Sequence, residues 1–338
     1  MSAAMTMTEP LLSLATMLLA AALSACIIPP IRPLLQRYAL ARPNARSSHR
    51  IPTPQGAGIA VIAATLLVTA IAAAQSGLAM PLALFGATLF IAVVGMVDDI
   101  RPIPVLPRLL LQATAVAAVI YSAPDGLRLA PMWPLWAERA LILLAGLWFV
   151  NLVNFMDGLD LMTVAEVVPI TAALTLLAWL GELGTLPMLV AAALCGAMLG
   201  FAPYNRPVAK MFLGDVGSLP IGLLLGWCLL QLAWQQHLIA ALLLPLYYLT
   251  DATVTLIRRI ARREPFWVAH RTHFYQRATD NGFSVAQVIA EVFALNMVLA
   301  ALAIAAATGS ATTAVLGFLF GALAVALVLL HFARKRHG

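Results

Sequence analysis

Charged residues are scarce in this sequence. Only 10% of its 338 residues are Asp, Glu, Lys or Arg, whereas 62% are hydrophobic. A soluble globular chain is about a quarter charged. So few charges could not cover the surface of a water-soluble fold of this size. The composition therefore excludes a soluble enzyme.

Cysteine is also scarce. The three cysteines, Cys26, Cys195 and Cys228, each lie inside an apolar run, which excludes a disulfide framework or a zinc site. The segment that ends at Cys26 is similar to a lipoprotein cleavage box. A secretory signal has a basic start, and residues 1–10 contain no Lys or Arg. We therefore predict a first transmembrane helix here.

What the sequence does have is a series of long, continuous apolar runs rich in Leu and Ala. The short alternating segments of an outer-membrane barrel are absent. Because a membrane helix needs about 20 apolar residues, we predict an all-α polytopic membrane protein of about eleven transmembrane helices in a single domain over residues 1–338. The runs cover residues 11–28, 57–75, 80–97, 109–123, 138–154, 161–180, 186–202, 219–235, 238–252, 285–306 and 312–331.

The basic residues set the predicted orientation. Between these spans, Lys and Arg gather on one side, and only Arg128 and Arg139 lie on the other. Cytoplasmic loops carry an excess of Lys and Arg. We therefore place the N-terminus in the periplasm and the C-terminus in the cytoplasm, in a bacterial inner membrane. The net charge of +6 is assigned to these loops and not to binding of nucleic acid.

The acidic residues gather at the same boundary. They are Asp98, Asp99, Asp157, Asp160, Asp215 and Asp251. An ion pathway would place acids near the middle of helices, whereas the nearest such cases here, Glu166 and Glu291, stand near the starts of their spans. The set favours chemistry at one face over transport. Carboxylates beside basic groups suit a magnesium-bound diphosphate, although each acid could instead pair with a nearby Arg.

Five segments carry more specific patterns. Residues 42–56 form a basic loop that contains Arg46, His49 and Arg50 and ends in Pro-Thr-Pro-Gln-Gly. Residues 95–99 end in Asp98 and Asp99. Residues 151–160 have the pattern N-x-x-N-x-x-D-G-x-D, in which the spacing puts Asn151, Asn154 and Asp157 on one face of a helix end. Residues 205–218 and 269–277 read NRPVAKMFLGDVGS and AHRTHFYQR.

Over nearly the whole chain, these segments resemble the polyprenyl-phosphate N-acetylhexosamine-1-phosphate transferases. The resemblance implies that Asp98 is a base, a nucleophile or a metal ligand, with Asp99 supporting it. It implies that Asp215 binds Mg²⁺, or Mn²⁺ as an alternative. Asp157 is implied as a second metal ligand, although it could instead be a structural cap. The donor-binding residues that it implies are Asn151, Asn154, Asp160 near the uracil, Asn205, Lys210 near a phosphate, and Phe212 stacked on the uracil.

The segment 269–277 departs from the family pattern, because Tyr275 and Gln276 stand where further histidines are common. It resembles a subgroup that starts O-antigen synthesis with 6-deoxy-N-acetylhexosamines. This resemblance implies that His273 is catalytic. It also implies that His270, Arg271 and Arg277 contact a diphosphate or sugar. Arg46, His49 and Arg50 form a basic patch suited to a lipid phosphate or diphosphate; the alternative is an ordinary basic cytoplasmic loop.

The implied reaction transfers a sugar-1-phosphate from a UDP-N-acetylhexosamine to polyprenyl (undecaprenyl) phosphate and releases UMP. The partners are these two substrates and the lipid bilayer, with a homodimer left open. The main alternative is a transporter or flippase. A CDP-alcohol phosphatidyltransferase would need an Ala-Arg pair soon after Asp157 and Gly158, and none follows there.

Overall fold

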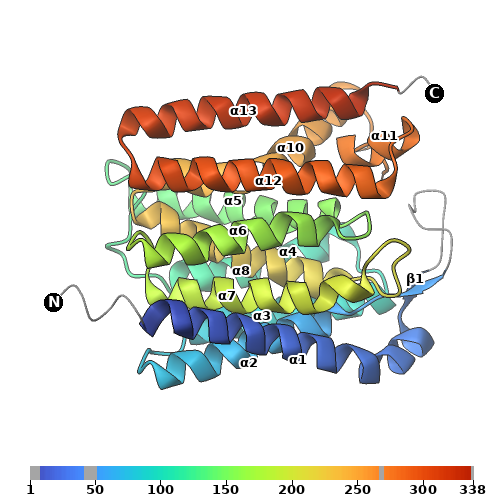
Figure 1. Cartoon of the computed structure of the whole chain (residues 1–338), viewed down its shortest axis with the longest axis horizontal. Coiled ribbons are helices and arrows are strands. Elements are labelled where there is room, and N and C mark those ends of the chain that lie inside the picture. Colours follow the sequence, from blue (N-terminus) through green and yellow to red (C-terminus); the bar gives the residue numbers. More distant parts are fainter. Residues whose placement is uncertain (1–7, 42–51, 266–269, 336–338) are drawn as a thin grey trace.

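The structure is a computed structural model that describes residues 8–41, 52–265 and 270–335. Long helices run side by side as a bundle (Figure 1). The helices are α1 (Thr8–Tyr38), α2 (Gly58–Gln75), α3 (Leu82–Ile100), α4 (Val105–Tyr121), α5 (Leu135–Met156), α6 (Met162–Trp179), α7 (Thr185–Phe201), η1 (Ala202–Tyr204), α8 (Asp215–Trp234), α9 (Leu238–Leu243), α10 (Leu246–Ala261), α11 (Phe274–Asp280), α12 (Val285–Thr308) and α13 (Ala311–Ala333). Strands β1 (Leu40–Ala41) and β2 (Thr53–Pro54) pair antiparallel.

The described helices confirm an all-α polytopic membrane protein. Nine of them are long and apolar enough to cross a bilayer, namely α1, α2, α3, α5, α6, α7, α8, α12 and α13. Helix α4 is apolar but shorter. The count of about eleven spans and the orientation of the termini stay predictions.

The predicted span over residues 238–252, in which the sequence marks Pro245 as a point where the helix could kink, is interrupted at that proline. Two helices stand there: α9 ends at Leu243 and α10 begins at Leu246. Pro245 lies between them, where its ring and its missing N–H prevent an unbroken α-helix. Helix α10 then continues to Ala261, well beyond the predicted end. The prolines do not all act alike, since Pro169 stays inside α6.

Two glycine contacts bring helices of the site end close together. A methyl group on Gly95 of α3 would overlap the backbone carbonyl of Asp215, and one on Gly58 of α2 would overlap the backbone of Gly217. Only a residue without a Cβ permits such close approach of two backbones. These contacts hold the start of α8 against the end of α3 and the start of α2.

The two ends of the bundle differ in character. The strands and α11 lie at the end where α13 finishes, and α1 begins at the opposite end (Figure 1). The connection between α4 and α5 holds its own ion pairs, Arg128 with Glu138 at 2.7 Å and Arg139 with Asp125 at 2.8 Å. The two basic residues assigned to the opposite side of the membrane thus have acidic partners of their own.

Helix α6 buries a carboxylate near its start. Glu166 in α6 is only 1% exposed and accepts a 2.6 Å hydrogen bond from the side-chain amide of Asn296. Its place near the start of α6 agrees with the sequence, and its burial requires such a polar partner.

Candidate active site

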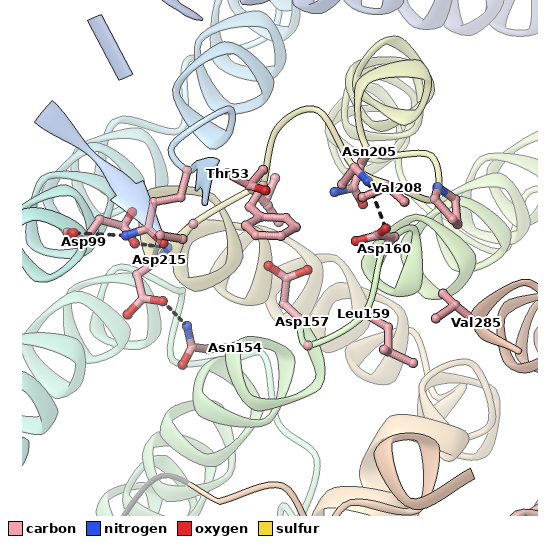
Figure 2. A pocket seen from close by; sticks show the side chains of 18 of the residues that line it. Thr53, Asp99, Asn154, Asp157, Leu159, Asp160, Asn205, Val208, Asp215 and Val285 are labelled. Carbon is pink, nitrogen blue, oxygen red and sulfur yellow. Dashed lines mark hydrogen bonds between the residues drawn. The ribbon is translucent and has the colours of Figure 1, made fainter. Parts of the chain in front are cut away.

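A cavity of about 560 Å³ opens where the acidic motifs converge. We call it the acidic cavity. Carboxylates of three separate segments line it: Asp99 from α3, Asp157 and Asp160 from the loop after α5, and Asp215 from the start of α8. Figure 2 shows these side chains around one space, with Asn154 and Asn205 at its edge. The structure thus brings together residues more than 100 positions apart in the chain.

Asp99 joins α3 to the first turn of α8. Its two carboxylate oxygens accept the backbone N–H groups of Asp215 at 2.9 Å and Val216 at 3.0 Å. The first N–H groups of a helix have no partner within the helix, and a carboxylate stabilises them. Asp99 therefore fixes the position of Asp215, whatever further role it has in the chemistry.

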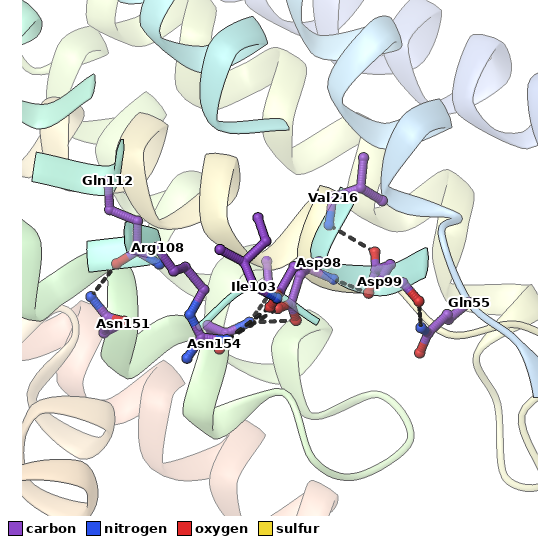
Figure 3. Close-up of polar contacts among 11 residues, drawn as sticks. Gln55, Asp98, Asp99, Ile103, Arg108, Gln112, Asn151, Asn154 and Val216 are labelled. Carbon is purple, nitrogen blue, oxygen red and sulfur yellow. Dashed lines mark hydrogen bonds and ion pairs between the residues drawn. The ribbon is translucent and has the colours of Figure 1, made fainter. Parts of the chain in front are cut away.

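Asp98 has different partners (Figure 3). It accepts the backbone N–H of Ile103 at 2.6 Å and forms a 2.8 Å ion pair with Arg108 of α4. The same Arg108 guanidinium lies 4.0 Å from Asp215. Arg108 thus links the paired aspartates to the fourth motif. The sequence suggested Arg108 only as one of many cytoplasmic basic residues.

The two asparagines of the third motif point to different partners. Asn154 donates to Asp215 at 2.7 Å and to the Ser218 hydroxyl at 2.9 Å. Asn151 is buried and donates to Gln112 of α4 at 2.7 Å (Figure 3). Asn154 therefore orients a carboxylate of the site, whereas Asn151 packs α5 against α4.

The two aspartates that follow α5 hold the adjoining segments. Asp157 accepts the Thr163 hydroxyl. Burial raises the pKa of Asp157 to about 6; the bond from Thr163 opposes this shift, and the carboxylates of Asp99 and Asp160 add to it. Asp160 accepts the backbone N–H of Ala209 at 3.0 Å. Both carboxylates face the acidic cavity, and Thr163 is a contact that the motif did not reveal.

Hydrogen bonds to backbone groups hold the fourth motif in place. Asn205 is buried; it accepts the N–H of Leu161 at 2.6 Å and donates to the carbonyl of Met211 at 2.9 Å. The N–H of Phe212 donates to the carbonyl of Pro54 at 2.9 Å, and its ring lines the acidic cavity. Asn205 and Phe212 thus shape the cavity wall. Lys210 is exposed and lines neither this cavity nor the next.

A second cavity, of about 690 Å³, lies among α4, α5 and α10. We call it the α4–α5–α10 cavity. Its walls carry many apolar side chains, among them Leu109, Leu144, Leu147, Trp148 and Leu256, together with Arg108, Asn151, His270 and His273. Asn154 and Asp215 line this cavity as well as the acidic one. The two cavities therefore share a polar wall.

The histidine segment lies beside the second cavity. The rings of His270 and His273 stack at 5.0 Å. Burial, together with the neighbouring His273 and Arg259, lowers the pKa of His270 to about 4. Arg271 pairs with Asp280 at 3.2 Å.

Of the remaining residues in this segment, some line a cavity and others do not. Neither Arg271 nor Arg277 lines either cavity. Tyr275 is fully buried and its hydroxyl donates to the carbonyl of Phe155 at 3.1 Å, so it ties α11 to the end of α5. Gln276 lines the acidic cavity. Arg46, His49 and Arg50 lie outside the described residues.

The carboxylates of the acidic cavity suit a magnesium ion. Within residues 8–41, 52–265 and 270–335, no three or more His, Cys, Asp or Glu side chains are grouped to hold a metal ion. Mg²⁺ commonly takes one or two carboxylates from the protein and its other ligands from water and phosphate. Asp157 and Asp215, both on the wall of the acidic cavity, fit that requirement.

Comparison with known proteins covers the second, third and fourth of these motifs. Residues 81–233 match the family model of glycosyl transferase family 4. The chain is 28% identical over 306 residues to a decaprenyl-phosphate N-acetylglucosaminephosphotransferase of Mycobacterium tuberculosis, covering 78% of this chain and 75% of the relative.

Two phospho-N-acetylmuramoyl-pentapeptide-transferases are also similar. The one from Symbiobacterium thermophilum is 33% identical over 227 residues, covering 60% of this chain and 67% of the relative. The one from Moorella thermoacetica is 27% identical over 317 residues, covering 85% and 96%. These relatives are bacterial phosphotransferases. The chain belongs to glycosyl transferase family 4, within the superfamily of polyprenyl-phosphate N-acetylhexosamine-1-phosphate transferases.

Proposed function

We propose that this protein transfers a HexNAc-1-phosphate from a UDP-N-acetylhexosamine to polyprenyl phosphate and releases UMP. The observation that carries the proposal is the wall shared by the two cavities. Asn154 and Asp215 line both, so a donor in one cavity and an acceptor in the other would meet at these side chains. We place this site at the cytoplasmic face of a bacterial inner membrane.

The acidic cavity is assigned to the donor. The ring of Phe212 offers a surface for the uracil, and Asp160 lies on the same wall. Asp157 and Asp215 would hold Mg²⁺, or Mn²⁺ in its place. A bound divalent ion would neutralise the diphosphate and the charge that develops on the leaving UMP. Asn154, by its 2.7 Å bond, holds the Asp215 carboxylate in position for this role.

The α4–α5–α10 cavity is assigned to the acceptor. Leu109, Leu144 and Leu256 give it an apolar surface for the first prenyl units, and Arg108 gives it a cation for the phosphate. Phosphoryl transfer depends mainly on positioning and on stabilising charge. The ion pair with Asp98 sets the position of that guanidinium. The second pKa of a phosphate monoester is about 6, so the attacking oxygen is largely ionised at neutral pH.

The resemblance of the segment His270–Arg277 supports a finer proposal. The donor sugar is a 6-deoxy-N-acetylhexosamine, and the product is the first lipid-linked sugar of an O-antigen-like polysaccharide at the cell surface. Gln276 is the member of this segment that reaches the acidic cavity.

The test uses the purified full chain with Mg²⁺, undecaprenyl phosphate and a panel of UDP-sugars. UMP release is measured, and the lipid product is identified by its mass. Asp215→Asn should abolish UMP release without affecting insertion into the membrane. Asp125→Asn is the matched control, because Asp125 pairs with Arg139 away from both cavities. Uptake of a solute into sealed vesicles without any UMP release would instead establish a transporter.

A further inference from the structure

A buried carboxylate outside both cavities organises the histidine segment. Asp251 in α10 is 0% exposed. It accepts the backbone N–H groups of Phe274 at 3.0 Å and Tyr275 at 3.2 Å, which open helix α11. It lies 3.2 Å from Nδ1 of His273. A buried carboxylate with this many partners holds α11 and the residue before it in one arrangement.

The other partners of Asp251 identify the proton on His273. Thr255 donates its hydroxyl at 3.3 Å and Tyr247 donates its hydroxyl at 3.4 Å. With the two backbone N–H groups, these are all donors, as expected for an ionised carboxylate, which only accepts. The Nδ1 of His273 must therefore carry the proton of its own bond to Asp251. The Nε2 of the same ring then points to a different partner, and it donates a hydrogen bond when it carries a proton.

The ring of His273 contacts two neighbouring rings. It stacks on His270 with 5.0 Å between centroids and on Tyr275 with 5.8 Å, at interplanar angles of 28° and 27°. The two nitrogens of an imidazole point in widely different directions. With Nδ1 directed to the buried Asp251, Nε2 points away from that carboxylate. The ring of His273 lines the α4–α5–α10 cavity, as does Arg108.

We propose that Asp251 is a positioning residue for phosphate recognition in the α4–α5–α10 cavity. It holds His273 through Nδ1–H and balances the charge of the imidazolium, so that Nε2–H donates a hydrogen bond to the phosphate of the lipid acceptor. The identity of that acceptor rests on the proposed function. The pairing of a carboxylate with one imidazole nitrogen, which fixes the tautomer and the direction of the other, is a general way of orienting histidine.

The kinetic test separates the two substrates. Asp251→Asn keeps an acceptor oxygen for one of the two backbone N–H groups, which bind different oxygens of Asp251, and removes the charge that holds Nδ1–H. We expect Asp251→Asn and His273→Ala each to raise KM for undecaprenyl phosphate about tenfold, as for loss of a hydrogen bond to a charged group. KM for the UDP-sugar should stay near its original value. The double variant should be no worse than His273→Ala alone, because Asp251 acts through His273.

Two controls remove other bonds to the same carboxylate. Thr255→Val and Tyr247→Phe each delete one side-chain donor to Asp251 and leave His273 unchanged. Both should keep the original KM for undecaprenyl phosphate. Additive effects of Asp251→Asn and His273→Ala, or an equal rise in KM for both substrates, would overturn the proposal in favour of a general structural role.

A spectroscopic test can be made on the unsubstituted protein and does not depend on turnover. In ¹⁵N-histidine-labelled protein, Nδ1 of His273 should be protonated, and Nε2 should be protonated and change its chemical shift when undecaprenyl phosphate is added. An unprotonated Nδ1, or an Nε2 signal that does not respond to the acceptor, would refute the proposal. If no UDP-sugar yields UMP while Nε2 still responds to the acceptor, the proposed transfer fails and the role of Asp251 stands.

Discussion

The substitution Arg108→Met tests the central ion pair of the site. Arg108 holds Asp98 at 2.8 Å, and the Asp98 side chain is only 7% exposed. After the substitution, Asp98 keeps the Ile103 N–H but loses its cation. Removing one partner of a buried pair costs about 3–5 kcal/mol. Because the Arg108 side chain is 22% exposed, water replaces part of the loss, and we expect the free energy of unfolding to fall by about 2–3 kcal/mol.

The assay is thermal unfolding in detergent. With an unfolding entropy of about 2.1 cal/mol/K per residue over 338 residues, this loss lowers Tm by about 3–4 °C. Adding Asp98→Asn to Arg108→Met should recover most of the loss, because a neutral amide needs no cation. An unchanged Tm in Arg108→Met, or a further drop in the double variant, would refute the reasoning.

Three further outcomes are expected. Thr163→Val removes the hydroxyl that opposes the raised pKa of Asp157, which is about 6. If catalysis needs the ionised carboxylate, activity is lost as pH falls through that pKa, so the acid limb of a kcat/KM profile should move to higher pH. Gly95→Ala should lower both Tm and UMP release, because its methyl group would overlap the backbone of Asp215, whereas Gly86→Ala, with open space around it, should change neither. Chelation of divalent ions should abolish UMP release and added Mg²⁺ should restore it; full activity of the metal-free protein would contradict the assignment of Asp157 and Asp215.

Most helices of this fold could be predicted because most of the long apolar runs in the sequence each form one helix of about the same length. The predicted span 161–180 corresponds to α6, Met162–Trp179, and 57–75 corresponds to α2, Gly58–Gln75. The break within 238–252 has a local cause. Pro245 separates α9 from α10, because its ring and missing N–H disfavour a helix interior, and α10 carries Arg258 and Arg259 in its last turn.

The sequence predicted the residues of the site better than their contacts. The motifs placed Asp157, Asp160 and Asp215 in one cavity, because short patterns of acid, amide and glycine are specific. Arg108 was missed as a partner of Asp98 because the turn between α3 and α4 has no periodicity from which to predict its direction. Charge type alone also gives no direction to a side chain. Lys210 suits a phosphate by its chemistry, yet it is exposed and lines neither cavity.

The polar wall shared by the two cavities has a consequence for the order of events. Asn154 and Asp215 line both cavities. With the donor and the acceptor in the two cavities as proposed, neither substrate would occupy the other's site. Such an arrangement favours a ternary complex with random order of addition and direct transfer of the sugar phosphate, without storage of that group on the protein between two half-reactions.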